Sequence, residues 1–220
     1  MTLKFTAIGK KAPKAISVTD YLSQCLLLES GYVYRGHGNA SWLLAPGAFR
    51  NGDGTSIVEI RERDKRISYY DKKEFDKEFT RLQAISSNRE ALHLENNGFS
   101  KIQKMVFFQH IGIPTPLLDW TESALVALFM AFAFRPANAT RLRIWRLSRL
   151  VAVDGLEYID YDDVGFERIR RQMGGITFFG SLSKDKKTLN LSSATFDEFF
   201  AKKKSTPVDF VDVKLDDAGV

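Results

Sequence analysis

The chain has 220 residues, a hydrophobic content of 44% that includes 17 phenylalanines, and a formal net charge of +5. This length and composition fit one domain with a substantial core. The single cysteine, Cys25, excludes a disulfide framework and a zinc site built from cysteines. The first residues contain no apolar stretch typical of a secretory signal, and no run approaches the ~20 apolar residues of a membrane span. We therefore expect a cytoplasmic protein that does not enter a membrane.

The positive charge, with a pI of about 9.2, would suit an anionic partner such as a nucleotide or a nucleic acid. The surplus is small, however, and the two signs of charge are mixed. The highly charged segment 62–81 alternates acids with bases, which predicts a solvated helix face and not a basic patch.

The N-terminal part predicts a helix followed by a strand. Ser17 with Asp20 marks the helix start, and Gly31 ends the segment. Three β-favouring residues, 32–34, then run into Arg35, and the glycines after it, Gly36 and Gly38, are expected to let the backbone come close to a neighbour. An arginine at a strand end beside glycines could bind a phosphate, or it could pair with a core carboxylate.

Residues 57–108 have a helical pattern and predict a cap or subdomain. Apolar residues recur at helical spacing through this region. Ser100 with Gln103 predicts a capping box at the start of the last helix.

The stretch from Gln109 to Phe132 organises the chain. Three residues that disfavour helix, Gly112, Pro114 and Pro116, predict an irregular turn. Asp119 is expected to cap the next helix, with Glu122 completing a capping box. That helix, 119–134, is apolar nearly all round, so we expect it to be the central buried element.

Polar residues gather at the entrance to this helix: Gln109, His110, Thr115, Asp119, Thr121 and Ser123. Such a cluster at the positive end of a helix could bind an anionic ligand, or it could be a hydrogen-bonded structural corner.

The C-terminal third alternates between strands and short helices. Its expected elements are a strand over 141–147, a loop over 152–163, a short helix over 166–172, a strand over 176–179, a helix over 193–204 and a strand over 209–215. Together with the preceding segments this predicts an α+β fold with a mixed or antiparallel sheet core.

Two stretches resemble the FRG domain family, which is named for a Phe/Tyr-Arg-Gly motif. The first is Tyr34-Arg35-Gly36, and the second, long and specific, runs from Gln109 to Thr121. A weaker third match joins Arg168, Gln172 and Gly174 to Phe178. One position departs from the family, which usually has an arginine where this chain has Pro116. The resemblance implies a single domain over residues 1–220, with 57–108 as a helical insertion or cap.

A remoter similarity links the chain to ADP-ribosyltransferases of the Arg-Ser-Glu class. Their strand-borne arginine binds an NAD phosphate, and Thr121-Glu122-Ser123, with Ala127 and Phe129, looks like their second motif. Gln172 lies near the position of their catalytic glutamate, but Gly174 stands where that glutamate would fall. This similarity implies an ADP-ribosyltransferase-like fold with NAD as cofactor or substrate. The implied nucleotide-binding residues are Arg35, Gly36, His110, Thr121 and Ser123, and the implied catalytic residues are Asp119 and Gln172.

Two functions remain open on this basis. One is an NAD-consuming transferase or glycohydrolase, acting as a bacterial or phage toxin or defence effector on a protein or nucleic-acid acceptor. The other is a non-catalytic module that binds a nucleotide, nucleic acid or protein partner. In either case we expect Arg35 to meet Thr121 and Ser123 at one concave site.

Overall fold

The fold was obtained as a computed structural model of the 220-residue chain. It describes residues 3–25, 31–52, 56–85, 99–164, 174–183, 189–201 and 206–215. The chain forms two compact units. The first unit comprises Met1–Leu44, Asp119–Ala152 and Phe196–Val220, and the second comprises Ala45–Leu118 and Val153–Thr195.

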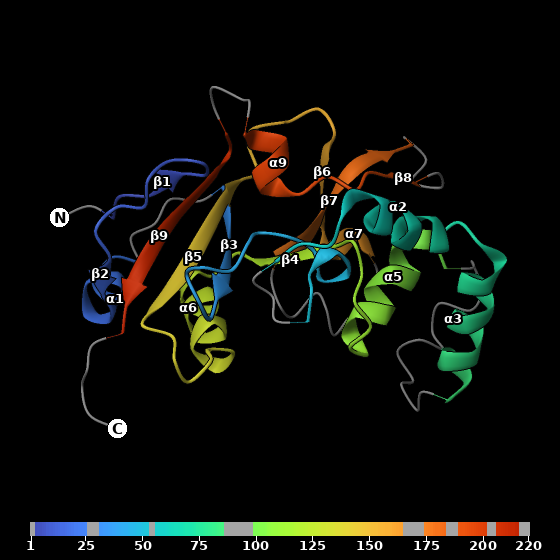
Figure 1. Ribbon diagram of the computed structural model, residues 1–220, viewed down its shortest axis with the longest axis horizontal. Coiled ribbons are helices and arrows are strands. Elements are labelled where there is room, and N and C mark those ends of the chain that lie inside the picture. Colours follow the sequence, from blue (N-terminus) through green and yellow to red (C-terminus); the bar gives the residue numbers. More distant parts are fainter. Residues whose placement is uncertain are drawn as a thin grey trace. The chain divides into compact units, whose positions relative to one another are not determined.

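The first unit is built on a sheet in the strand order β1-β9-β5-β3-β4 (Figure 1). Its pairings are antiparallel apart from the short β2, which runs parallel to β9. The strands are β1 (Thr6–Ala7), β2 (Ile16–Ser17), β3 (Tyr32–His37), β4 (Leu118–Thr121), β5 (Arg141–Ser148) and β9 (Val208–Lys214).

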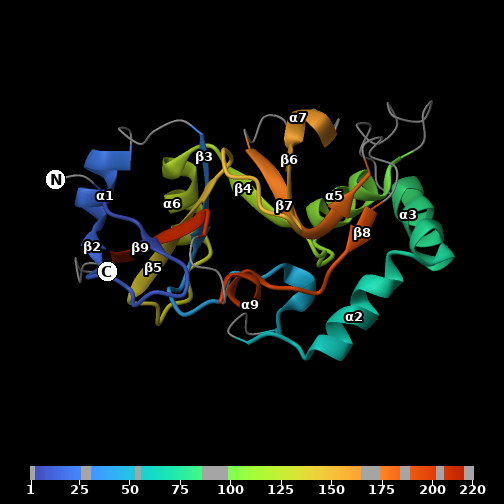
Figure 2. The same cartoon turned by 90° about the horizontal axis from the view of Figure 1, so that it is seen from above.

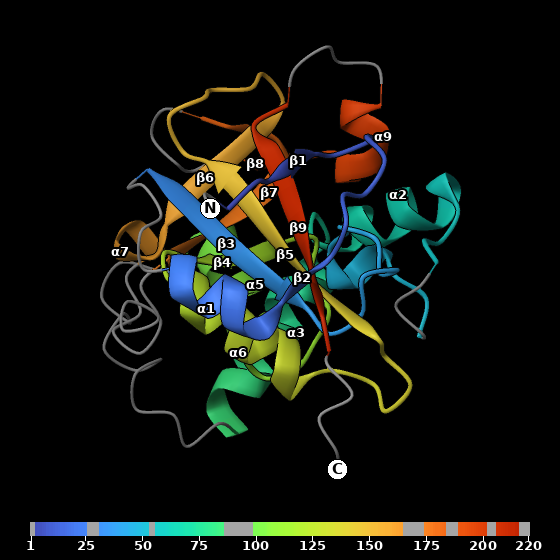
Figure 3. The same cartoon turned by 90° about the vertical axis from the view of Figure 1, so that its left-hand side faces the viewer.

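Three helices flank this sheet: α1 (Val18–Cys25), α6 (Ala124–Ala133) and α9 (Phe196–Phe200). Helices α1 and α6 lie on one side of β3, β5 and β9, and α9 lies on the other side (Figure 2, Figure 3). The buried Tyr21 hydroxyl joins α1 to α6 by donating to the carbonyl of Ala124, at 3.1 Å. On the opposite face, the Phe196 ring of α9 packs edge-on against Trp120.

Residue alternation explains why the sheet has two different faces. In β5, Leu142 and Ile144 point to the α1/α6 side, where they share a buried cluster with Val211 and Val213 of β9. The alternate residues of the two strands point to the other face, and they include the paired Arg143 and Asp212. This unit confirms the predicted strands over 141–147 and 209–215.

The second unit combines helices with a smaller set of strands. Its elements are the 3₁₀ turn η1 (Gly47–Phe49), the helices α2 (Ile60–Tyr69), α3 (Lys73–Ile85), α5 (Lys101–His110) and α7 (Tyr161–Val164), and the strands β6 (Leu156–Asp160), β7 (Gly174–Leu182) and β8 (Leu189–Leu191). Strand β7 pairs antiparallel with both β6 and β8. The core is aromatic: Phe75 contacts Phe108, and Phe79 contacts Phe107, each in an edge-to-face arrangement.

The structure confirms the mixed α+β class and corrects two elements of the prediction. The helical character of the described part of 57–108 and the Ser100–Gln103 capping box are both present. The expected loop over 152–163 instead contains β6 and the start of α7. The expected short helix over 166–172 lies outside the described residues.

The second correction concerns α6, which was expected to be buried nearly all round. It buries only Ala124, Ala127, Leu128 and Ala131, while its remaining face is exposed. The helix also begins at Ala124 and not at Asp119. Among the residues that the structure describes, no helix combines the length and apolar character needed to cross a membrane.

Candidate functional site

The glycine of the Tyr-Arg-Gly segment allows a close approach between β3 and α6. A Cβ atom added to Gly36 would lie 1.8 Å from the main-chain oxygen of Ala127. Two residues on, a Cβ at Gly38 would lie 2.4 Å from the oxygen of Phe134. The sequence predicted that these glycines admit a close neighbour, and that neighbour is the backbone of α6. Packing thus accounts for Gly36 without a ligand, and its nucleotide-binding role stays a prediction.

Arg35 leaves β3 on the face opposite to Gly36, because successive strand residues point to opposite sides of a sheet. Its directly paired residue is Trp145 of β5, which shares that face. The Arg35 Nη1 group donates to the main-chain oxygen of Asp119 at 2.7 Å. This bond fixes the guanidinium and joins the first motif to the second.

Strand β4 gives Asp119 a different role from the one predicted. Asp119 lies within β4, and Ser123 is the N-cap of α6, since its Oγ accepts from the Val126 N–H at 3.2 Å. The expected cap at Asp119 and its capping box with Glu122 are therefore wrong. Glu122 instead accepts a hydrogen bond from Arg149 at 2.6 Å. Pairing of Tyr34 with Thr121 holds β4 to β3, and the N-cap lies four residues further along the chain than expected, at Ser123.

The second motif begins in the second unit, where it forms a hydrogen-bonded corner after α5. The buried Thr115 donates through Oγ1 to Gln109 at 2.7 Å, and its carbonyl accepts from the Ala48 N–H. The Tyr70 hydroxyl donates to the carbonyl of Pro114 at 3.0 Å. Gly112 adopts a φ of 85°, which favours glycine. These contacts support the structural interpretation of this part of the cluster.

The Arg35 face carries a polar network that the sequence analysis did not single out. Arg143 makes a two-pronged ion pair with the buried Asp212, at 2.7 and 3.0 Å. On the neighbouring strand, the buried His37 accepts through Nδ1 from the Trp145 indole at 3.1 Å. A neutral His37 in this bond carries its proton on Nε2. A local signal was present, because Arg143 stands between two apolar residues of β5 and Asp212 between two apolar residues of β9.

Asp197, in the first turn of α9, is part of the same environment. Burial raises the pKa of the Asp197 carboxyl, although the Leu44 N–H and the positive charge of Arg143 act in the opposite direction. Its Oδ2 atom is buried and makes no hydrogen bond with the residues that the structure describes. A carboxyl with a raised pKa is a candidate for proton exchange, although structural networks also produce such shifts.

The predicted site residues therefore do not all gather in one place. Arg35 meets the backbone of Asp119, but Thr121 pairs opposite Tyr34 and so faces α6, where Ser123 caps the helix. Arg35 and Ser123 lie on opposite faces of the sheet, and the expected shared concave site fails in that form.

Two further site residues lie elsewhere. His110 is an exposed residue at the end of α5 in the second unit. Gln172 lies outside the described residues. The ligand roles assigned to these residues stay predictions. In the described part of the chain, no three His, Cys, Asp or Glu side chains cluster as metal ligands would.

Comparison with known protein families identifies a match to this chain. A family model of the FRG domain matches residues 30–141, just over half of the 220 residues. The match contains both Tyr34-Arg35-Gly36 and the segment from Gln109 to Thr121, and therefore both partners of the Arg35–Asp119 bond. Neither the curated proteins nor the solved structures contain a significant match to the chain.

Proposed function

The chain belongs to the FRG domain family, and we propose on that basis that it is a nucleotide-binding domain in which Arg35 anchors a phosphate of an NAD-like ligand. The ADP-ribosyltransferase-like fold is part of this proposal and rests on the remote similarity of motifs. The expected role as a toxin or phage-defence effector follows only from that similarity.

The observation that supports the proposal is the hydrogen bond from Arg35 to the Asp119 carbonyl. It spans the two family motifs, which are 84 residues apart in the chain. The bond holds the guanidinium of the half-buried Arg35 in a defined orientation. A guanidinium fixed before the ligand arrives loses little side-chain entropy on binding and can present its planar fork to a phosphate.

The polar composition of the surrounding face supports the same proposal. His37, Trp42 and Trp145 contribute two ring contacts with centroid distances of 6.3 and 5.9 Å on the side to which Arg35 points. His37 and Trp145 are buried, so of these three rings the half-buried Trp42 is the one placed to stack on a nucleotide base. The ion pair between Arg143 of β5 and Asp212 of β9 lies on this face and holds the two strands' side chains in place.

Binding can be tested by calorimetric titration of the full chain with NAD, ADP-ribose and nicotinamide. A phosphate anchor predicts that NAD and ADP-ribose bind, whereas nicotinamide, which has no phosphate, does not. Binding of a small nucleotide should fall only modestly between 50 and 200 mM salt, while adventitious RNA binding through many phosphates should collapse. Absence of a binding signal with both phosphate-bearing ligands would overturn the proposal.

Cleavage of NAD is the second candidate function, and one observation favours it. Ser123 takes the capping role that was expected to occupy Asp119, so the Asp119 carboxylate is not needed to start α6. A carboxylate near the glycosidic bond would stabilise the cation that forms as nicotinamide leaves. The observation that weakens this function is that Asp119 lies two residues from Thr121 and so shares the α6 face, away from the Arg35 side chain.

Nicotinamide release from NAD separates catalysis from binding. An amide cannot supply the negative charge of the transferase glutamate, so the natural protein is expected to be slow if Gln172 occupies that position. Gln172→Glu should then raise the rate, and Asp119→Asn should lower it. If the wild type and both variants bind NAD but release nicotinamide only at the background rate, the protein is a non-catalytic binding module.

A further inference from the structure

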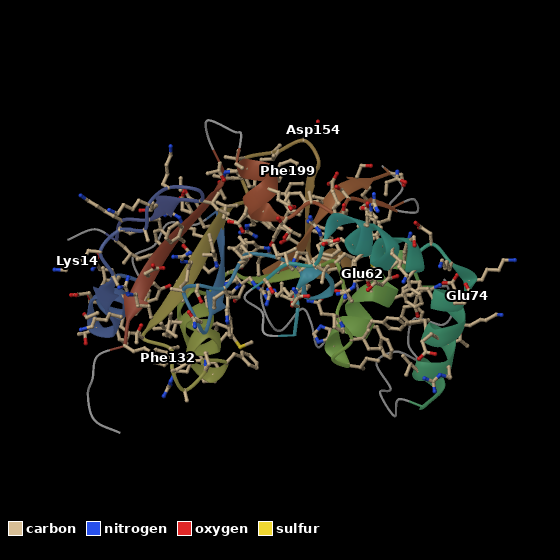
Figure 4. The ribbon with its side chains drawn as sticks, in the orientation of Figure 1. Lys14, Glu62, Glu74, Phe132, Asp154 and Phe199 are labelled. Atoms are coloured by element: carbon tan, nitrogen blue, oxygen red, sulfur yellow. The ribbon has the colours of Figure 1, made fainter. Side chains whose placement is uncertain are left out.

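Helix α6 exposes an apolar face of unusual extent. Its ten residues, ALVALFMAFA, include no charged or polar side chain. The exposed fractions are 46% for Leu125, 42% for Val126, 66% for Phe129, 41% for Met130 and 64% for Phe134, which follows the helix. Figure 4 shows the side chains of this region, with Phe132 of α6 labelled. We call these five exposed residues the α6 patch.

The α6 patch is one continuous stripe and not a set of scattered positions. Residues 125, 126, 129 and 130 are spaced as neighbours on one side of a helix. The buried positions, Ala124, Ala127, Leu128 and Ala131, occupy the opposite side against the sheet. A helix with one face in water normally carries polar residues there. Taking about 200 Å² for a fully exposed large apolar residue, the patch exposes roughly 500 Å², near the upper end for a monomer surface.

We propose that the α6 patch is a homodimer interface, in which α6 packs antiparallel against α6 of a second copy of this chain. This inference is independent of the proposed nucleotide binding. The chemistry of the helix ends favours a second copy as the occupant. Glu122, which pairs with Arg149 of its own chain, precedes the helix and Arg135 follows it, and both are exposed. An antiparallel pair brings Glu122 of each copy beside Arg135 of the other and opposes the two helix dipoles.

The central position of the stripe fits a two-fold contact. The midpoint between Glu122 and Arg135 falls between Leu128 and Phe129, and Phe129 is the most exposed of the patch. A two-fold axis there would bury Phe129 against its own equivalent at the centre of the contact, where aromatic residues contribute most to binding. Because α6 contains no charge, self-association desolvates no ionised group within the helix.

The size of the patch predicts a weak, concentration-dependent dimer. Two patches of roughly 500 Å² give about 1,000 Å² in total, which is the lower limit for a specific interface. We therefore expect the dimer to dissociate on dilution through the micromolar range and not to be permanent.

Sedimentation equilibrium of the full chain over a concentration series tests the proposal. The wild type should move from monomer toward dimer as concentration rises. Phe129→Glu should raise the dissociation constant at least tenfold, because it places like charges at the axis. Ile60→Glu is the matched control: Ile60 is an isolated apolar residue of α2 that is 59% exposed, and its substitution should change nothing. Circular dichroism verifies that both variants fold.

A charge exchange tests the antiparallel arrangement itself. Arg135→Glu places two acids together and should weaken the dimer. Adding Glu122→Arg together with Arg149→Glu, which keeps the intrachain pair with its charges reversed, should restore it. A wild type that stays monomeric at every concentration would overturn the proposal and leave the patch for a different partner. A dimer unaffected by Phe129→Glu would place the interface elsewhere and would overturn it as well.

Discussion

The two faces of β3 differ in kind. On one face, Gly36 lies against the backbone of α6, and the neighbouring contacts are apolar. On the other, Arg35 and His37 point toward charged and aromatic residues of β5. Within the Tyr34-Arg35-Gly36 motif, the adjacent Arg35 and Gly36 therefore have different roles. The glycine is explained by helix packing, whereas the arginine carries the proposed phosphate contact, so the proposal concerns the Arg35 face alone.

The largest expected effect follows from filling the space beside α6. Gly36→Ala should lower the free energy of unfolding by about 4 kcal/mol or more, because a main-chain oxygen at 1.8 Å cannot move aside as a side chain would. Chemical denaturation measures the loss. Gly52→Ala is the control, since no atom lies within 4 Å of its added Cβ. Equal stabilities for the two variants would mean that α6 packs less closely on β3.

The ion pair of the Arg35 face should give the next largest effect. Asp212→Ala leaves Arg143, whose side chain is 17% exposed, without its two-pronged partner, and should cost about 3 kcal/mol. Asp209 pairs with Arg146 on the opposite face, where both side chains are more than 20% exposed. Asp209→Ala should therefore cost less, about 1 kcal/mol. If urea denaturation gives the reverse order, the assignment of the two faces is wrong.

Capping of α6 should produce a smaller effect. Ser123→Ala removes the acceptor for the Val126 N–H and should cost about 1 kcal/mol. Asp119→Ala should cost less, because Asp119 lies within β4 and the N-cap of α6 is Ser123. Thermal unfolding of the two variants distinguishes them, and a larger loss for Asp119→Ala would restore the helix start that the sequence suggested.

The smallest effect concerns the pH dependence contributed by Asp197. Burial raises the pKa of this carboxyl above its usual value of 3.8, so the folded protein holds the proton more tightly than the unfolded chain. The contribution of Asp197 to stability is therefore greatest below that value and falls as pH rises through the folded pKa. Asp197→Asn should gain stability relative to wild type as the pH rises above about 4. A difference that stays constant above that pH would exclude the shift.

Local patterns were sufficient to predict several elements. β-Favouring residues predicted β3, alternation predicted β5, and the Ser100–Gln103 pair predicted a capping box that is present. Each of these depends on residues close in the chain. The start of α6 does not, because pairing of Thr121 with Tyr34 competes with capping at Asp119 and is a contact between distant residues.

The candidate site was harder to predict for two physical reasons. Polar residues normally mark the exposed side of a helix. Since α6 has none, its sequence predicted a fully buried helix and gave no indication of which side is exposed. The second reason was avoidable: strand alternation already implies that Arg35 and Gly36 point in opposite directions. A binding site formed by both Arg35 and Gly36 was therefore inconsistent with the β-strand that these residues predicted.

The affinity of paired arginine variants for NAD tests the central claim most directly. Arg35 and Arg146 are half-buried arginines on adjacent strands, and Arg146 pairs with Tyr34, on the opposite face. Calorimetry should show that Arg35→Lys weakens NAD binding by about 1–3 kcal/mol, because the bidentate contact with phosphate is lost. Arg146→Lys, folded to the same extent, should bind NAD as the wild type does. Wild-type affinity in the Arg35→Lys variant, or an equal loss in both variants, would contradict the assignment of Arg35 as the phosphate anchor.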